Sequence, residues 1–338
     1  MLNIFQNDAF STVALTRLLN ATPYIPNLLD TLGIFAEEKI GVRSAAIERL
    51  GNQLSLVPTT PDGAPPATTP RDKRTIRDVR TVRLAQTDRI YAHELANLRR
   101  PGSELDLEEV SDFALRRMQK LRQKNDLTLE NLRLGCVTGS VKDADGTTVL
   151  FDPAAFWGVT LPTAIDFNLD IDTTDVDGKC RSVVRLMEKN SEGGMLPNST
   201  IYGLCGDAFF DAFVAHPNVK TWYLNRPAAD QYLAGTTTRR VTFGGIVFIN
   251  YRGTDDGTTV GVNTDHCRFV LAGGDEVFSM LFSASNENFE LMNLPALPVY
   301  AMMSIDPSAR KAWVDVDVFS YPLPIVKRPL TLIYATRT

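Results

Sequence analysis

Few residues in this sequence have the types and spacing that catalysis needs. The chain has three histidines, and His266 lies between Asp265 and Cys267, the three residue types of a Cys–His–Asp nucleophile. Neighbouring side chains in a strand point to opposite faces of a sheet, so His266 and Cys267 could not form a hydrogen-bonded dyad there. The sequence therefore predicts no catalytic residue and no enzyme.

An acidic stretch, DIDTTDVDG, could be read as a cation site, since it brings four aspartates together before Gly178. Aligning Gly178 with the sixth position of a calcium loop puts Thr173 at the first position and Val184 at the twelfth, where both fail the ligand requirement. We expect a solvated loop that caps the next helix, and no metal site.

The cysteines and glycines also lack the spacing of a binding site. The four cysteines, at positions 136, 180, 205 and 267, include no CxxC pair, which predicts neither a zinc site nor a disulfide framework. We expect buried, reduced thiols in a protein made in the cytoplasm. No glycine motif for phosphate or dinucleotide binding occurs, so we predict no cofactor.

The most informative charge pattern is an arginine series that repeats every third residue: Arg71, Arg74, Arg77, Arg80 and Arg83. Residues 71–89 hold seven basic and three acidic residues, while the whole chain has a net charge of −5. Phosphate binding is one interpretation, but no aromatic residue interleaves the arginines to stack on bases. A basic segment on an acidic body favours contacts between copies of the same protein.

The arginines cannot share one face of a strand, because a strand repeats every two residues and this series every three. Odd-numbered and even-numbered members must point to opposite sides. We expect one side to meet a neighbouring subunit, and the other to face solvent or a further partner.

The segment that carries these arginines, residues 37–92, reads as a long hairpin or flap. Two strand-like limbs flank a proline-rich tip between 58 and 70 that no helix or central strand can cross. The segment has too few large apolar residues to build a core of its own, so it must lie on something else.

The N-terminal segment, residues 1–36, reads as an arm rather than a compact domain. Ser11 can cap a short helix to Asn20, and Pro23 and Pro26 then break the chain. Three leucines give the helix an apolar side that we expect to contact other copies: Leu15, Leu18 and Leu19.

The longest predicted helix covers residues 103–135, beginning at a capping signal on Ser103 and ending at Gly135. Asp145-Gly146 predicts a type I′ hairpin turn, and Gly244-Gly245 predicts the tip of a second hairpin. Helices and strands mix through residues 166–310, and residues 311–338 return to extended structure around a proline-marked turn at 322–329. The fold class is therefore α+β.

Composition limits the class of protein. The chain has 338 residues, of which 44% are hydrophobic and 22% charged, as is ordinary for a globular protein. No basic and apolar leader opens it, and no apolar run approaches 18 residues, so we expect no signal peptide and no membrane contact.

Three stretches, in order along nearly the whole chain, resemble the phage major capsid protein E family, the lambda-type coat proteins. They are LGIFAEEKIGVRSAAIERLGNQLSLVPTTPDGAPP (Leu32 to Pro66), DLTLENLRLGCVTGSVKDADGTTVLF (Asp126 to Phe151) and SYPLPIVKRPLTLIY (Ser320 to Tyr334). The resemblance implies the Hong Kong ninety-seven type capsid fold of tailed phages.

That fold supplies names for the segments. The resemblance implies an N-terminal arm (1–36), an E-loop (37–92), a P-domain with its spine helix (93–170), an A-domain (171–310), and strands that return to the P-domain (311–338). The lysine–asparagine crosslink of some relatives is not carried over, because nothing in the sequence identifies its residues.

The resemblance also implies a function. We expect a major capsid protein that assembles into hexamers and pentamers of an icosahedral head around packaged double-stranded DNA, which it contacts only weakly. Its expected location is the virion, and scaffolding, portal and decoration proteins are its expected partners. A tail-tube or other virion component, or an α/β enzyme, remains the alternative. Electron microscopy would separate closed shells, tubes and single particles.

Overall fold

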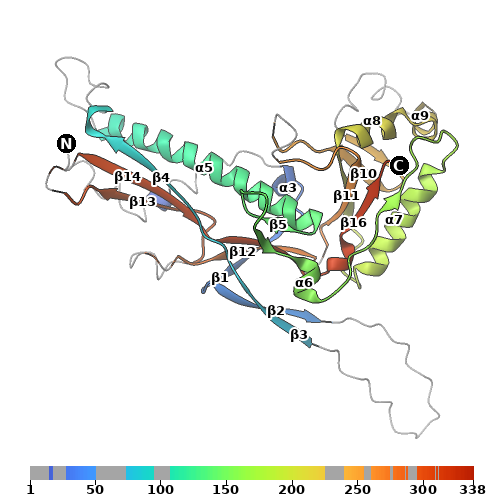
Figure 1. Ribbon diagram of the computed structural model, residues 1–338, viewed down its shortest axis with the longest axis horizontal. Helices are drawn as coiled ribbons and strands as arrows, with labels where there is room; N and C mark the ends of the chain where they lie inside the picture. Colours follow the sequence, from blue (N-terminus) through green and yellow to red (C-terminus); the bar gives the residue numbers. More distant parts are fainter. Residues whose placement is uncertain are drawn as a thin grey trace, which may run out of the picture.

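The computed structural model describes residues 15–17, 28–50, 74–94, 107–224, 240–254, 260–274, 277–285, 287, 295–308, 310 and 312–338. A long helix and a three-stranded sheet form one end of the molecule, and a six-stranded sheet with its helices forms the other (Figure 1). A two-stranded ribbon projects between these ends. Helices and strands thus both build the fold, which confirms the predicted α+β class.

The first end consists of helix α5 (Leu107–Thr138) packed on an antiparallel sheet. The sheet has the order β13 (Tyr300–Ile305), β14 (Trp313–Ser320) and β4 (Leu84–Tyr91). Alternate residues of these strands face the helix, so that Ile90, Val316 and Val318 form a core with Ala114 and Met118.

Helix α5 connects three separate cores because its buried residues recur at three- and four-residue spacing. Met118 packs on the first sheet, Leu129 packs on a central sheet, and Leu132 and Cys136 enter the core of the far end. With 32 residues and about 1.5 Å of rise per residue, the helix is about 48 Å long. The three larger sheets of the molecule therefore pack along this helix.

The helix ends later than predicted, at Thr138 rather than Gly135. Gly135 stays helical and serves a close approach, since a Cβ there would lie 2.9 Å from the Ser140 carbonyl oxygen. The chain turns instead at Gly139, whose φ of 92° is a conformation that favours glycine. Sequence alone did not distinguish a glycine that stops a helix from one that admits a neighbour.

The far end contains a sheet with the order β7 (Ile165–Asp166), β16 (Ile333–Thr336), β11 (His266–Ala272), β8 (Thr200–Cys205), β10 (Ile246–Asn250) and β9 (Arg240–Phe243). Helices α7 (Val176–Asn190), α8 (Asp207–Ala215) and α9 (Pro217–Leu224) accompany it. Phe213, Phe248 and Phe269 lie in the core between sheet and helices. The predicted hairpin at Gly244-Gly245 joins β9 to β10.

A central sheet of β1 (Ala36–Ile40), β12 (Phe278–Ser283) and β15 (Pro322–Val326) links the two ends. The predicted turn at 322–329 is wrong, because its first half is strand β15. Pro322 and Pro324 fit this strand because it lies at the sheet edge. The hydrogen bond from Ser283 N–H to the Tyr321 carbonyl sets the register, so both prolines occupy positions that do not hydrogen-bond to β12.

The turn predicted at Asp145-Gly146, beside helix α5, also differs from the one in the structure. Strands β5 (Val141–Lys142) and β6 (Val149–Phe151) pair as predicted and lead into helix α6 (Pro153–Trp157). A type I′ turn needs positive φ at both central residues, but Gly146 has positive φ and Asp145 does not. The Asp145 carboxylate instead accepts the N–H groups of Thr147 and Thr148. The turn is therefore built by a side chain.

The predicted segments, such as the E-loop and the returning strands, do not each correspond to one sheet. Strand β4 of the predicted E-loop lies in the sheet beneath α5, and β1 lies in the central sheet. The predicted returning segment 311–338 divides among the three larger sheets, through β14, β15 and β16, with the 3₁₀ turn Pro329–Thr331 between the last two. Of the described residues in the predicted E-loop, those of β2 (Ser44–Leu50) and β3 (Arg74–Arg80) form the projecting ribbon.

Candidate functional site

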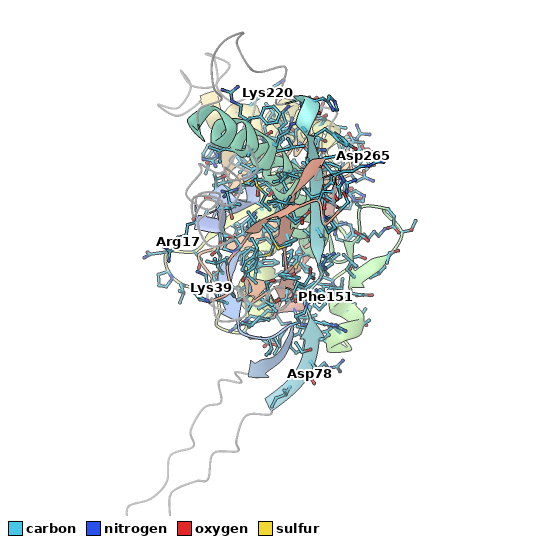
Figure 2. The ribbon with its side chains drawn as sticks, turned by 90° about the vertical axis from the view of Figure 1, so that its left-hand side faces the viewer. Arg17, Lys39, Asp78, Phe151, Lys220 and Asp265 are labelled. Carbon is cyan, nitrogen blue, oxygen red and sulfur yellow. The ribbon has the colours of Figure 1, made fainter. Side chains whose placement is uncertain are left out.

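The ribbon of β2 and β3 carries the arginine series and has two unlike faces. The strands pair antiparallel from Ser44 opposite Arg80 to Leu50 opposite Arg74. The ribbon extends beyond the body, with Asp78 on its projecting part (Figure 2). The proline-rich tip lies outside the described residues, as do Arg71 and the side chain of Arg74.

The inner face of the ribbon carries Ala45, Ile47, Arg77 and Val79, and its apolar residues pack on the chain's own body, whereas Arg77 stays exposed. Ile47 is 5% exposed, and Ala45 and Val79 pack against the main core. The Arg77 guanidinium lies 5.9 Å from the ring centroid of Phe156 in α6. Arg77, predicted to contact another subunit, therefore has an intramolecular partner.

The outer face of the ribbon, formed by Ser44, Ile76, Asp78 and Arg80, is exposed to solvent. Ile76 has 61% of its surface exposed, and Val42, two residues before β2, has 62% exposed. Isolated exposed apolar residues are common, but Ile76 shares one face of a projecting ribbon with Arg80, and such a face is suited to a partner. Among the members of the series whose side chains the structure describes, Arg80 is thus the one on the outer face of the ribbon.

Arg83 lies at the base of the ribbon and is paired within its own chain. Its Nη2 donates a hydrogen bond to Glu287 Oε2 at 2.7 Å, and its Nε donates to Oε1. The bonds from Arg83 lower the pKa of the Glu287 carboxyl. Arg83 therefore has an intramolecular partner, while its side chain stays 46% exposed, and its predicted contact with another copy stays a prediction.

Backbone and aromatic contacts complete the base of the ribbon. The Val82 N–H donates to the Pro322 carbonyl at 3.1 Å, and the hydroxyls of Thr81 and Ser283 share a hydrogen bond of 3.0 Å. The Arg43 guanidinium lies 4.7 Å from the Tyr321 ring centroid. These contacts set the direction in which the ribbon leaves the central sheet.

One of the predicted contact residues of the N-terminal arm, Leu15, is buried within its own subunit. Leu15 is 3% exposed and belongs to the core between α5 and the first sheet. The Thr16 hydroxyl accepts from the Ala301 N–H and donates to the Ala301 carbonyl. Leu15 is therefore an intramolecular anchor and not an exposed contact, while Leu18 and Leu19 lie outside the described residues.

Buried charge on α5 was missed by the sequence analysis. Glu130 is 2% exposed, and its Oε1 accepts the Leu29 N–H at 3.2 Å and the Tyr251 hydroxyl at 2.8 Å. Burial raises the pKa of the Glu130 carboxyl. This carboxylate ties the spine to helix α3 (Leu28–Thr31) and to the end of β10.

Two ion pairs flank Glu130 on the same helix. Arg133 binds Asp30 at 2.8 Å, and Arg122 lies 3.7 Å from Asp126. Burial raises the pKa of Asp126 to about 6 despite the opposing effect of Arg122. The available signal was the four-residue spacing of Arg122, Asp126 and Glu130 on an otherwise apolar face.

The residues considered for catalysis are not brought together as a reactive set. Cys267 is buried on β11, and burial raises the pKa of its thiol, while the adjacent His266 is partly exposed and packs on Tyr334. In the acidic loop, Asp175 accepts the Gly178 N–H at 2.9 Å and caps α7, as predicted. Within the described ranges, no group of three metal-ligating side chains could hold an ion.

A hollow of about 340 Å³ lies beside the start of α8, lined by Gly206, Asp207, Tyr251, Arg252, Gly261, Val262, Asn263 and Thr264. Its two oppositely charged side chains bind each other, with Arg252 Nη2 donating to Asp207 Oδ2 at 2.8 Å. They are thus engaged as a structural pair.

The part of the chain that the structure describes has no helix long and apolar enough to span a bilayer.

Comparison with known sequences identifies relatives along the whole chain. The family model for phage major capsid protein E matches residues 11–337. The major capsid protein of Pseudomonas phage KPP10 is 24% identical over 344 residues, covering 95% of this chain and 97% of that protein. The major capsid protein of Salmonella phage Felix O1 is 24% identical over 269 residues, covering 75% and 72%.

Solved structures share the fold at low sequence identity. A protein assigned as the capsid protein of a prophage in E. coli CFT073 superposes with a TM-score of 0.56 and 14% identity, covering 97% of this chain and 99% of that one. A chain of the mature capsid of bacteriophage PhiM1 gives a TM-score of 0.51 and 12% identity, covering 94% and 89%.

The family match and the fold agree with each other. The matched region contains the spine helix, both end sheets and the projecting ribbon. The predicted capsid fold is confirmed by the structural relatives. The chain belongs to the phage major capsid protein E family and is a phage major capsid protein.

Proposed function

We propose that copies of this chain assemble into hexamers and pentamers of an icosahedral head that encloses double-stranded DNA, with the outer face of the ribbon resting on the next copy. One observation carries the second part of this proposal. The ribbon's inner face is occupied by its own body, whereas Val42, Ile76 and Arg80 on or beside its outer face remain exposed.

The chemistry of that face favours a protein partner. Covering Val42 and Ile76 removes apolar surface from water, which supplies about 25 cal/mol per Å². The planar guanidinium of Arg80 adds paired N–H donors that can bind a carboxylate on the partner. An acidic partner surface is available from further copies, because the whole chain has a net charge of −5 while residues 71–89 are basic.

The same charge distribution supports only weak contact with packaged DNA. A chain with 40 acidic and 35 basic residues lacks the basic excess of a dedicated nucleic-acid binder. Scaffolding, portal and decoration proteins are the further partners that we propose. The chain would be made in the host cytoplasm and reside in the virion.

Electron microscopy of the purified full-length protein tests the proposal. Closed shells built from rings of five and six copies are the expected result. Tubes would instead support a tail component, and single particles at high protein concentration would contradict self-assembly. A density map of the shell would further place the outer face of the ribbon on a neighbour or in solvent, and the latter overturns the proposed contact.

A further inference from the structure

Two cysteines lie directly opposite each other at the centre of the six-stranded sheet. Cys205 of β8 pairs with Cys267 of β11, and their Sγ atoms are 3.4 Å apart. All four cysteines of the chain are free thiols and are buried. This pair was not apparent in the sequence, where 62 positions separate its members.

The backbone hydrogen bonds show which kind of cross-strand pair this is. The Gly206 N–H donates to the His266 carbonyl at 2.9 Å, so the adjacent pair, Gly206 and His266, is the hydrogen-bonded kind. Cys205 and Cys267 therefore form a non-hydrogen-bonded pair, in which the Cα atoms approach to about 4.5 Å and the side chains lie closest. That separation lies inside the range of about 4.4–6.8 Å that disulfides span.

Closing the bond requires the two sulfurs to approach each other. A disulfide needs the sulfurs about 2.05 Å apart, so they must approach by about 1.4 Å. A Cβ at Gly203 would lie 3.0 Å from Cys267 Sγ, which shows that the absence of a side chain there makes room for this thiol. Rotation of the two short side chains can supply the approach.

We propose that Cys205 and Cys267 are a redox-reactive pair that closes to a disulfide stapling β8 to β11. With a small external disulfide such as oxidised glutathione, one thiolate attacks the oxidant and releases one reduced glutathione. The second thiolate then attacks the mixed disulfide, forms the Cys205–Cys267 bond and releases another. Two protons leave the protein thiols, and two electrons pass to glutathione.

The burial of both sulfurs determines when this reaction occurs. Thiolates are the nucleophiles, and burial raises the pKa of the Cys267 thiol, so reaction is slow while the sheet is closed. The pair stays reduced in a reducing cytoplasm and closes after exposure to an oxidising medium. The time at which the disulfide forms rests on the proposed function, in which the protein leaves the cytoplasm as part of a virion. The proximity of the two cysteines does not depend on that function.

Peptide mapping of the oxidised full-length protein tests the proposal. The protein is incubated with oxidised glutathione in ordinary water, and a parallel sample in deuterated water measures through the amide exchange of β8 how often the sheet opens. After the β8 amides have exchanged, the expected product is about 2 Da lighter, from the loss of two hydrogens. It contains a peptide joining Cys205 to Cys267, retains two of the four thiols and melts at a higher temperature.

Variants and alternative products separate the pair from general thiol oxidation. Cys205→Ser and Cys267→Ser should each abolish the mass loss, whereas Cys136→Ser should retain it. Wild-type mapping decides the question if a variant fails to fold. Four free thiols after β8 has exchanged, a stable glutathione adduct, or a bond from either residue to Cys180 would overturn the proposal. Failure of assembly would leave this reaction intact, so the two proposals can be distinguished.

Discussion

Arg83 and Glu287 are joined side by side through two hydrogen bonds, although 204 positions separate them in the sequence. The pair closes the base of the ribbon beside Tyr321, so a charge reversal at Arg83 would disturb the subunit itself. A test of contacts between copies must therefore use Arg80, which belongs to the same series and faces outward.

We predict that Arg80→Glu leaves the subunit folded with wild-type circular dichroism but prevents shell assembly at low salt. The new carboxylate would face the acidic surface of the next copy. Screening shortens the reach of charge to about 3 Å at 1 M salt, so added salt should partly restore assembly. Light scattering measures the result.

A matched control for Arg80 is Lys142→Glu, a reversal at another exposed cation on β5. It should assemble with a smaller loss. Normal assembly of Arg80→Glu at low salt would show that the outer face of the ribbon is not an electrostatic contact.

We predict that Glu287→Gln lowers the free energy of unfolding by about 1 kcal/mol or less, because the pair is partly exposed. The pKa of Glu287 is lowered in the folded chain. Its contribution is therefore present above the unfolded pKa of about 4.3 and is lost as pH falls through the lower folded value. Urea titrations at pH 7 and pH 3 should show the difference between variant and wild type shrinking in acid.

A charge swap, Arg83→Glu with Glu287→Arg, should recover most of that small loss. If the swapped protein is less stable than either single variant, the pair does not act through its charges.

Asp126 should make stability depend on pH in the opposite direction. Its pKa is raised to about 6 by burial, so its favourable contribution is complete below the unfolded pKa of about 3.9 and is lost as pH rises through 6. A shift of this size corresponds to about 3 kcal/mol. We predict that Asp126→Asn is more stable relative to wild type at pH 8 than at pH 4.5.

Denaturant unfolding across pH 4 to 8 measures that slope, with Asp211→Asn as a matched control at an exposed carboxyl. If the stability of Asp126→Asn relative to wild type is the same at both ends of the range, the pKa of Asp126 is not raised by burial.

Leu15→Ala should destabilise the isolated subunit by about 2–5 kcal/mol, the range for a leucine truncated in a core. Val149→Ala, at a residue that is 52% exposed, should change stability by about 0.5 kcal/mol or less. Thermal unfolding of unassembled protein measures both. An effect of Leu15→Ala that appears only in shells would restore the predicted role of the arm as a contact between copies.

Several features of this protein could be predicted from local sequence because local rules control them. The apolar spacing along the spine predicts a long helix, and the two-residue period of a strand separates Arg77 from Arg80. Asp175 caps the helix that begins at the next residue by accepting the N–H of Gly178, three residues on. The ordered resemblance of three stretches then identified the capsid fold, which the structural relatives confirm.

The features that were missed depend on residues far apart in the chain. The sequence predicts that Leu15 is exposed on an arm, but in the fold it packs in a core with Ala301 and Met118. It likewise predicts a turn at Pro324, but this proline lies in strand β15 at the edge of a sheet. Gly135, Arg83 and the Cys205–Cys267 pair likewise acquire their roles from neighbours absent in the local sequence. Burial and pairing depend on which surfaces meet, and tertiary packing brings those surfaces together.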